Sequence, residues 1–533
     1  MDFARPSSSN SSWKSLCNVV EYSGIFDSEY RQPHSRCMEN TRVVLQNRIT
    51  QVLDQRDRTN IWLNGLAGVG KTSIAFTIAE KMKAAERLAG TFFFSHKHAQ
   101  KTAAIIPTIA YQLALAFPRV QEDIVKAIER DDMLLSPGKS HADQLRELVI
   151  KPLQILRFRE HPYTIIIDAL DECLSSEEAA RLVTLLTEAL AGPALPFVHI
   201  IFTSRPEAHI LAARPSGVHE IILTTRDKDT IRDVRLFLRA SLEKTRTIRP
   251  TVFGQPPIPW PSKDEFETLA FKAGGLFIYA AMAVNFISAP GHHPQKRLDL
   301  LLCEKSAVVA DIDQLYRQII GTSEDSLVQC QLLASIIHLA RPLPLAELQE
   351  IFHRNKKSFA VMLEAFSPVI LNDGVGHVEI YHASLRDFMS DPQRSKEYHI
   401  NDAQAHEHLA CCCLHLFLRQ SPPSTSYPFW AWNKHLSMAY PSPRLRKLLD
   451  QFTGKTLPRW VQAPGDSHIH YTYSTLRQAR RTCLSLKWIK GPSDIVVAWR
   501  IHKAFKEIAK SHDKCSRNWA NSQIRSRSRN IAV

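Results

Sequence analysis

The chain has 533 residues, of which 44% are hydrophobic and 23% are charged, which excludes a disordered protein and is enough for about three or four domains. Its net charge of +14 is unevenly placed, because the segment from Arg477 to the end holds 14 Lys and Arg against three acids. Such a segment suits nucleic acid, acidic lipid or an acidic partner, and it is also typical of a solvated, partly disordered tail.

Nothing in the sequence predicts a membrane span or a secreted protein. The most apolar stretch, residues 270–287, contains Lys272, Asn285 and a pair of glycines, whereas a span needs about 20 apolar residues with almost no charge. The N-terminus is rich in serine and lacks the apolar core of a signal peptide. We therefore expect a cytoplasmic protein whose ten cysteines are mostly thiols.

Long apolar runs with helical spacing outnumber alternating ones, which predicts a helix-rich α/β protein. The first motif is Gly65-Leu-Ala-Gly-Val-Gly-Lys-Thr72, which fits the P-loop pattern G-x-x-x-x-G-K-[ST]. A short apolar strand at 61–63 precedes it, and apolar residues at helical spacing follow it. The predicted nucleotide-binding residues of this loop are Gly65, Leu66, Ala67, Gly68, Val69, Gly70, Lys71, Thr72 and Ser73.

The residue types in this loop match the chemistry of a triphosphate. Glycines let backbone N–H groups close around phosphates, and a helix N-terminus adds the positive end of its dipole. Lys71 would reach the β- and γ-phosphates, while the hydroxyl of Thr72 would ligate Mg²⁺. The alternative, a glycine-rich turn that binds nothing, is disfavoured by the flanking strand and helix.

A second apolar strand, residues 164–168, ends in Asp168 and continues as Ala-Leu-Asp-Glu. A carboxylate at the tip of a buried strand beside a P-loop is where a Walker B Asp holds Mg²⁺, so we assign Asp168 to the metal. Asp171 and Glu172 are the candidate catalytic residues, because they could polarise the attacking water. They could instead be the cap and first-turn acids of the helix that opens just after them.

A third apolar strand, 199–203, leads into Thr-Ser-Arg-Pro. Arg205 at its tip could contact the γ-phosphate and so distinguish ATP from ADP, or it could be a surface residue that caps a loop. Further along, the run from His406 to His415 contains His, Glu and three adjacent cysteines. Its apolar residues share one helical face, and no second cysteine pair stands at zinc-finger spacing, so we interpret it as a core helix rather than a metal site.

Together these strings resemble the NACHT NTPase domain of fungal NOD-like proteins, from Trp62-Leu-Asn-Gly-Leu-Ala-Gly-Val-Gly-Lys-Thr72 through Thr91-Phe-Phe-Phe-Ser95 and Ile167-Asp-Ala-Leu-Asp-Glu-Cys173 to Phe202-Thr-Ser-Arg-Pro206. The resemblance extends to Cys37–Arg42 ahead of the P-loop, Thr108–Leu113, the Gly-Leu stretch Gly274–Ala280, and Arg341–Leu348 and Tyr381–Phe388 in a winged-helix part. It covers about residues 37–440 and is most specific at the NTPase motifs.

The resemblance implies a switch of the STAND class of P-loop NTPases, closed with ADP and able to oligomerise after exchange to ATP. In related proteins a winged-helix His contacts the ADP phosphate, and His382 is the matching candidate; it could instead be a core histidine between Ile380 and Leu385. No repeat array of the kind that often follows the winged helix is found after it.

The expected fold is an α/β protein with a P-loop NTPase parallel-sheet core followed by helical and winged-helix domains. The predicted segments are a partly disordered N-terminus (1–38), the NACHT core (39–225), a helical domain (226–322), a winged-helix-like domain (323–395), a C-terminal helical region (396–490) and a basic tail (491–533).

The leading functional prediction is an ATP-preferring switch with slow NTP hydrolysis, which binds ATP or ADP with Mg²⁺ and acts in signalling or defence through nucleotide-controlled self-association. One alternative is a P-loop enzyme of the kinase or motor type that acts on a substrate, although no helicase-like motif series or second catalytic cluster is present. Another is a nucleic-acid-binding protein that uses its basic tail.

Overall fold

The computed structural model describes residues 8–28, 36–95, 102–157, 161–173, 176–212, 214–253, 260–303, 311–321, 326–353, 359, 363, 366–372, 377–419, 425–458, 469–485 and 488–529. They fall into two compact units, Met1–Leu315 and Tyr316–Val533. The division lies close to the predicted end of the helical domain at residue 322.

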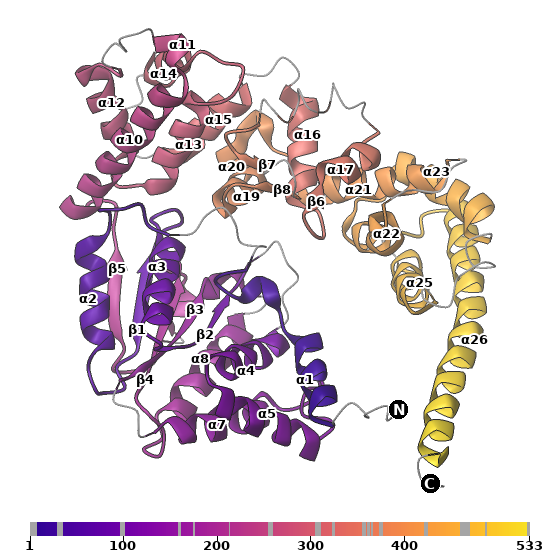
Figure 1. Ribbon diagram of the computed structural model, residues 1–533. Coiled ribbons are helices and arrows are strands. Elements are labelled where there is room, and N and C mark those ends of the chain that lie inside the picture. Colours follow the sequence, from indigo (N-terminus) through magenta and orange to yellow (C-terminus); the bar gives the residue numbers. More distant parts are fainter. Residues whose placement is uncertain are drawn as a thin grey trace. The chain divides into compact units, whose positions relative to one another are not determined.

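The first unit is built on a five-stranded parallel sheet (Figure 1) with the order β2-β3-β4-β1-β5. The strands are β1 (Ile61–Gly65), β2 (Leu88–Phe93), β3 (Tyr163–Asp168), β4 (Val198–Ser204) and β5 (His219–Leu223). Strands β1, β3 and β4 are buried along their whole length, which explains why they are continuous apolar runs. Because parallel strands end at one edge of the sheet, the P-loop after β1 lies at the same edge as Asp168 and Arg205.

Helices flank this sheet and then continue as a helical segment. α3 packs across β1, β3 and β4, and α4 packs against β2. The helices of the core are α2 (Val43–Leu53), α3 (Lys71–Ala84), α4 (Ile105–Ala116), α5 (Pro118–Arg130), α6 (His141–Leu145), α7 (Lys151–Leu153), α8 (Ser176–Leu190) and α9 (Ala208–Ala212). The following segment contains α10 (Lys228–Ile248), α11 (Pro250–Phe253), α12 (Lys263–Ala273), α13 (Phe277–Ile287), α14 (Pro294–Cys303) and α15 (Ile312–Gly321).

Residues 8–28 differ from the expectation of a partly disordered N-terminus, because they pack onto the NTPase core. In α1 (Ser8–Val19), Leu16 is fully buried and Trp13 stacks on Tyr111 of α4 with ring centroids 5.5 Å apart. After the 3₁₀ helix at Tyr22–Gly24, the backbone N–H of Phe26 donates to Oγ1 of Thr91 in β2. The described part of the N-terminus therefore belongs to the core.

The second unit starts with helices around a three-stranded antiparallel sheet of order β6-β8-β7. The winged-helix-like domain predicted for residues 323–395 stays a prediction. The elements are α16 (Ser326–Ile337), β6 (Leu343–Pro344), α17 (Leu345–Ile351), β7 (Ile370–Asn372), β8 (His377–Ile380), α19 (Ala383–Ser390) and α20 (Pro392–Ser395).

A helical array follows, with α21 (Asp402–Phe417), α22 (Tyr427–Met438), α23 (Pro443–Gln451), α25 (Ile469–Cys483) and α26 (Pro492–Arg529). In α21 the side chains of Cys411, Cys412 and Cys413 are buried, which fits their interpretation as small core residues. Among the described residues no cluster of His, Cys, Asp or Glu could hold a metal ion. Nor does any described helix combine the length and apolar character needed to cross a membrane.

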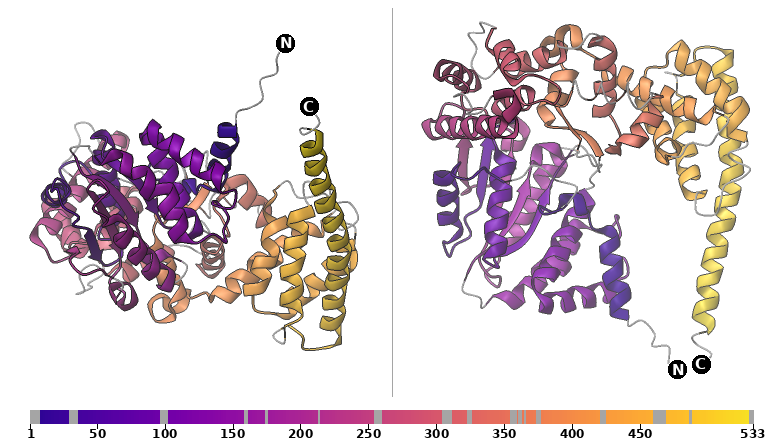
Figure 2. Two further views of the ribbon diagram at one scale, coloured as in Figure 1. Left: turned by 90° about the horizontal axis from the view of Figure 1, so that it is seen from below. Right: turned by 45° about the horizontal axis from the view of Figure 1, so that its top comes forward.

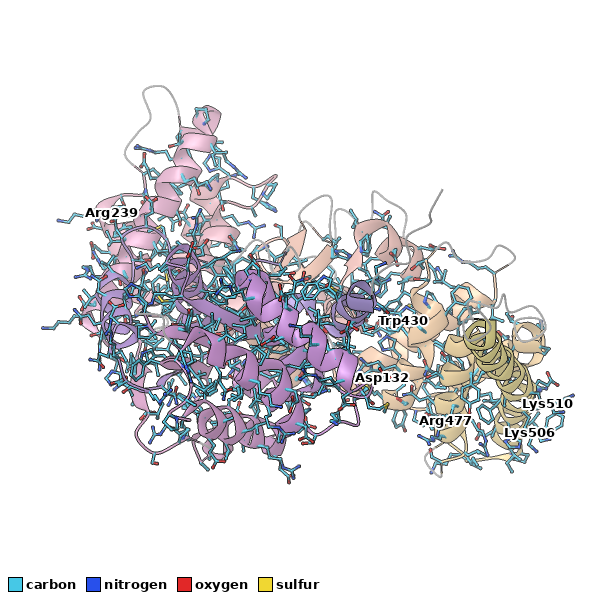
Figure 3. All side chains as sticks on the ribbon, turned by 60° about the horizontal axis from the view of Figure 1, so that its bottom comes forward. Asp132, Arg239, Trp430, Arg477, Lys506 and Lys510 are labelled. Atoms are coloured by element: carbon cyan, nitrogen blue, oxygen red, sulfur yellow. The ribbon has the colours of Figure 1, made fainter. Side chains whose placement is uncertain are left out.

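The basic tail is a long helix over most of its length, which differs from the solvated, partly disordered tail that its charge also suggests. α26 runs from Pro492 to Arg529 without interruption (Figure 2). After its first residue the helix contains neither Pro nor Gly, and Val497, Ile501 and Ile508 bury one face of it. Arg477 of α25, with Lys506 and Lys510 of α26, projects from the surface of this helical pair (Figure 3).

Candidate nucleotide-binding site

The P-loop has the backbone geometry that its glycines predict. Gly68 and Gly70 have φ values of +78° and +95°, a region that favours glycine because it has no Cβ. Gly70 is the N-cap of α3, and no side chain caps the helix there. The first N–H groups of α3 therefore lack an intrahelical partner and are available to an anion, which is the arrangement that binds phosphate.

Lys71 is folded back onto its own loop. Its ammonium donates to the carbonyl oxygens of Gly65 at 2.6 Å and Leu66 at 2.9 Å. Burial lowers the pKa of Lys71, while Asp171 and Asp168 oppose that shift. Lys71 thus lies in the P-loop near Asp168 and Asp171, as predicted. A bound phosphate would offer its ammonium charged acceptors, which bind more strongly than two carbonyl oxygens.

Asp168 ends β3 with its side chain buried. Oγ1 of Thr203 donates to its Oδ1 at 2.6 Å and accepts a hydrogen bond from the backbone N–H of Ala169 at 2.9 Å. Ala169 has a left-handed φ of +58°, so the chain turns sharply after the strand. Thr203 therefore fixes both the carboxylate and the turn, a role that the sequence did not reveal because the two residues are 35 positions apart.

Asp171 and Arg205 form one unit. The backbone N–H of Arg205 donates to Oδ1 of Asp171 at 3.0 Å, and its Nε lies 3.0 Å from Oδ2. The side chain of Asp171 is 6% exposed, whereas that of Arg205 is 23% exposed. Asp171 therefore has the geometry of a residue that orients Arg205, which differs from the predicted role in activating water.

Glu172 and Thr72 remain candidates for the chemistry predicted for them. Glu172 ends the 3₁₀ helix at Leu170–Glu172, is half-buried, and acts on the Lys71 ammonium as a nearby negative charge. Thr72 is exposed in the first turn of α3. With Asp168 it supplies hard oxygen donors beside the phosphate cradle, which suits Mg²⁺.

The helical segment touches the P-loop directly. The backbone N–H of Ile278, near the start of α13, donates to the carbonyl of Gly68 at 3.1 Å. A Cβ on Gly68 would lie 2.1 Å from Cγ2 of Ile278, and one on Gly275 would lie 2.1 Å from the carbonyl oxygen of Thr225. Gly68 is thus required where α13 meets the P-loop, and Gly275 is required where the segment before α13 meets Thr225. The Gly-Leu stretch is a recognisable sequence motif, whereas its contact with the P-loop depends on packing between segments about 200 residues apart.

His382 is the N-cap of α19 in the second unit. Its Nδ1 accepts a hydrogen bond from the backbone N–H of Ser384 at 3.1 Å and lies 2.8 Å from the Ser384 hydroxyl. The residue is half-buried, so it is a helix cap rather than a core histidine. Its contact with ADP stays a prediction.

Comparison with known protein families gives a match to part of the NTPase core. A family model described as nephrocystin 3, N-terminal, matches residues 41–205, which is less than half of the chain and contains the P-loop, Asp168 and Arg205. No curated protein matches.

Three solved structures are similar over long stretches. Cdc6p from Pyrobaculum aerophilum is 13% identical, with 72% of this chain and 97% of that chain covered and a TM-score of 0.32. The Orc1 protein from Aeropyrum pernix in complex with DNA is 14% identical, with coverages of 67% and 91% and a TM-score of 0.28. Drosophila ORC bound to DNA is 10% identical, with coverages of 96% and 74% and a TM-score of 0.27.

All three TM-scores are low. The nucleotide-binding core is therefore identified from the sheet order, the loop geometry and the residues at the strand ends. The chain has a P-loop nucleotide-binding core on a parallel sheet, and the part of it between residues 41 and 205 is similar to the N-terminal region of nephrocystin 3.

Proposed function

We propose that this protein is an ATP-preferring molecular switch of the NACHT/STAND class, with slow hydrolysis, that acts in signalling or defence through nucleotide-controlled assembly. The observation that carries the proposal is the hydrogen bond from Ile278 to the P-loop carbonyl of Gly68. The loop that would hold the phosphates is bonded to the first turn of a helix outside the sheet, so a movement of that helix would be felt at the phosphate site.

The strand-tip residues supply a means of distinguishing two nucleotides. Arg205 is partly exposed and held by Asp171, at the edge of the sheet where Lys71 and Asp168 also lie. A guanidinium there can bond a γ-phosphate, which ATP has and ADP lacks. A ligand shifts a conformational equilibrium only by its different affinity for the two states, and this contact is a source of that difference.

The residues present fit a nucleoside triphosphate and one Mg²⁺. The N-terminus of α3 and Lys71 would hold the phosphates, while Thr72 and Asp168 would hold the cation, which neutralises phosphate charge when bound. Of the two acids that follow Asp168, Asp171 contacts Arg205, and we assign the orientation of water to Glu172.

The experiment has two steps. Nucleotide released from the purified protein by denaturation is identified by anion-exchange chromatography, where adenine nucleotide is expected. Sedimentation velocity then compares the protein with ADP and with a non-hydrolysable ATP analogue, and a larger species is expected with the analogue alone. Tight nucleotide binding with the same monomer in both would instead favour an ordinary P-loop enzyme.

A further inference from the structure

Arg42 is a buried arginine whose side chain reaches from the segment ahead of α2 to the P-loop. It is 5% exposed and has a left-handed φ of +56°. Its Nη2 donates to the carbonyl of Val69 at 2.7 Å, and its Nη1 donates to Oγ1 of Thr230 in α10 at 2.6 Å. The guanidinium also lies 5.0 Å from the ring centroid of Phe277 in α13.

Further hydrogen bonds fix the backbone of Arg42 and the hydroxyl of its partner Thr230. Oδ2 of Asp233 accepts the backbone N–H of Arg42 at 2.8 Å, which fixes the strained backbone. The hydroxyl of Thr230 donates to Asp227, the N-cap of α10. Burial lowers the pKa of Arg42, but Asp233 and Asp227 oppose that shift. Burying a cation costs free energy unless the cation is hydrogen-bonded. Both terminal nitrogens of Arg42 have such a partner.

The consequence for the P-loop follows from the planarity of the peptide bond. In a trans peptide the carbonyl and the next N–H point in opposite directions. The Val69 carbonyl points toward Arg42, so the N–H of Gly70 points away from Arg42. The preceding peptide is fixed in the same manner, because the Gly68 carbonyl is held by Ile278.

We propose that Arg42 is a positioning residue for phosphate binding, which presets the Gly70 N–H through the Val69 carbonyl and ties that peptide to α10 through Thr230. The inference depends on the proposed nucleotide site and adds a regulatory link to it. A movement of α10 would pull on Arg42 and rotate one donor of the phosphate cradle, so the position of α10 and nucleotide affinity become coupled.

The test compares four proteins by calorimetric titration with ADP and with AMP. Arg42→Met keeps the length of the stem but removes both donors, and Thr230→Val removes the acceptor in α10 without touching the loop. Arg48→Met, an exposed arginine on α2, is the matched control. We expect ADP affinity to fall about tenfold for Arg42→Met and about threefold for Thr230→Val, with Arg48→Met unchanged.

Two further measurements separate positioning from general damage. AMP lacks the β-phosphate, so its affinity should fall less than that of ADP, whereas partial unfolding would lower both equally. The double variant Arg42→Met/Thr230→Val should bind ADP no more weakly than Arg42→Met alone, because Thr230 acts only through Arg42.

If Arg42→Met does not fold, the ADP and AMP affinities of Thr230→Val alone test the inference. Wild-type ADP affinity in a folded Thr230→Val protein, or equal losses for ADP and AMP, would overturn the inference. Failure of the wild-type protein to bind either nucleotide would instead overturn the nucleotide site itself.

Discussion

At the scale of single residues, Lys71 is the most direct test of the site. Lys71→Ala removes the mobile cation of the loop, so ATP and ADP should bind at least about tenfold more weakly, or about 1.4 kcal/mol. Calorimetry measures this. Lys83→Ala is the control on the same helix, because the Lys83 side chain is 61% exposed and pairs with Asp27. Equal affinity for Lys71→Ala and wild type would refute the P-loop assignment.

The two acids after Asp168 should separate into different roles. Glu172→Gln is expected to leave ATP binding intact and to slow hydrolysis, since it removes the carboxylate that we propose orients the attacking water. Asp171→Asn should instead reduce the preference for ATP over ADP, because the charge that holds Arg205 Nε is lost. Phosphate release and competitive binding of the two nucleotides measure these effects. Wild-type turnover in Glu172→Gln would leave that acid as a helix cap.

At the scale of residues, the sequence predicted which residues form the site, but it did not predict which other residues hydrogen-bond to them. The P-loop, Asp168 and Arg205 follow from short motifs in which the residue type itself carries the chemistry. The partners come from elsewhere in the chain, as for Arg42 and Thr230, which are 188 positions apart. Such pairs depend on how the helical segment packs, and no local pattern encodes that packing.

At the scale of secondary-structure elements, α21 and α22 share a line of buried imidazoles. Nδ1 of His406 lies 2.9 Å from Nδ1 of His435, whose Nε2 lies 2.7 Å from the hydroxyl of Tyr427. The ring of His338, which directly follows α16, is 5.0 Å from that of His406, and its Nε2 lies 3.2 Å from Oδ1 of Asp402. Burial, reinforced by His338, lowers the pKa of His406 to about 4, and burial lowers that of His435 strongly.

These helices should lose stability on acidification. A histidine whose pKa is lowered in the folded state is neutral there while the unfolded chain takes up a proton, so stability falls as the pH drops from about 6.5 toward 4. The shift at His406 alone corresponds to about 2 kcal/mol between pH 7 and pH 5. Melting temperature against pH measures it.

The variant His406→Asn keeps a hydrogen-bonding group that does not titrate, so its melting temperature should depend less on pH. His377→Asn, at an exposed position on β8, is the control. An unchanged pH dependence in His406→Asn would mean that the pKa of His406 is not lowered by folding, with Asp402 offsetting the effects of burial and of Lys434.

Strands that are buried along their whole length could be predicted from the sequence, whereas a strand at the edge of the sheet was harder to predict. Strands β1, β3 and β4 follow from unbroken apolar runs, whereas β5 at the sheet edge has only two buried residues and no such run. The helix over Pro492–Arg529 differs from a partly disordered basic tail because Val497, Ile501 and Ile508 recur at helical spacing and are buried. Basic residues are good helix formers when an apolar face is buried.

At the scale of the whole molecule, the switch requires two contacts with opposite preferences. Arg205 would favour the ATP state through a γ-phosphate, and His382, as the resemblance implies, would favour the ADP state through the β-phosphate. Each could supply about 1–3 kcal/mol. Together they approach the roughly 5.5 kcal/mol that inverts a population of 1:99.

Sedimentation velocity distinguishes the two contacts. Arg205→Ala should remain a monomer with the ATP analogue, while His382→Ala should self-associate even with ADP. Because His382 also caps α19, His382→Asn is the necessary companion: asparagine keeps a cap, so self-association in both variants would point to the lost phosphate contact. Wild-type behaviour in every variant would contradict the switch.

The packing of residues 8–28 limits where the chain can be shortened. Gly24 lies against the ring of Phe92 in β2, and Phe26 packs edge-on against Phe76 of α3 with centroids 5.4 Å apart. A chain cut just ahead of the P-loop motif would leave these aromatic rings facing water, and exposed apolar patches promote aggregation. The smallest soluble NTPase unit is therefore expected to begin near residue 8, well before the first residue that any nucleotide-binding motif would suggest.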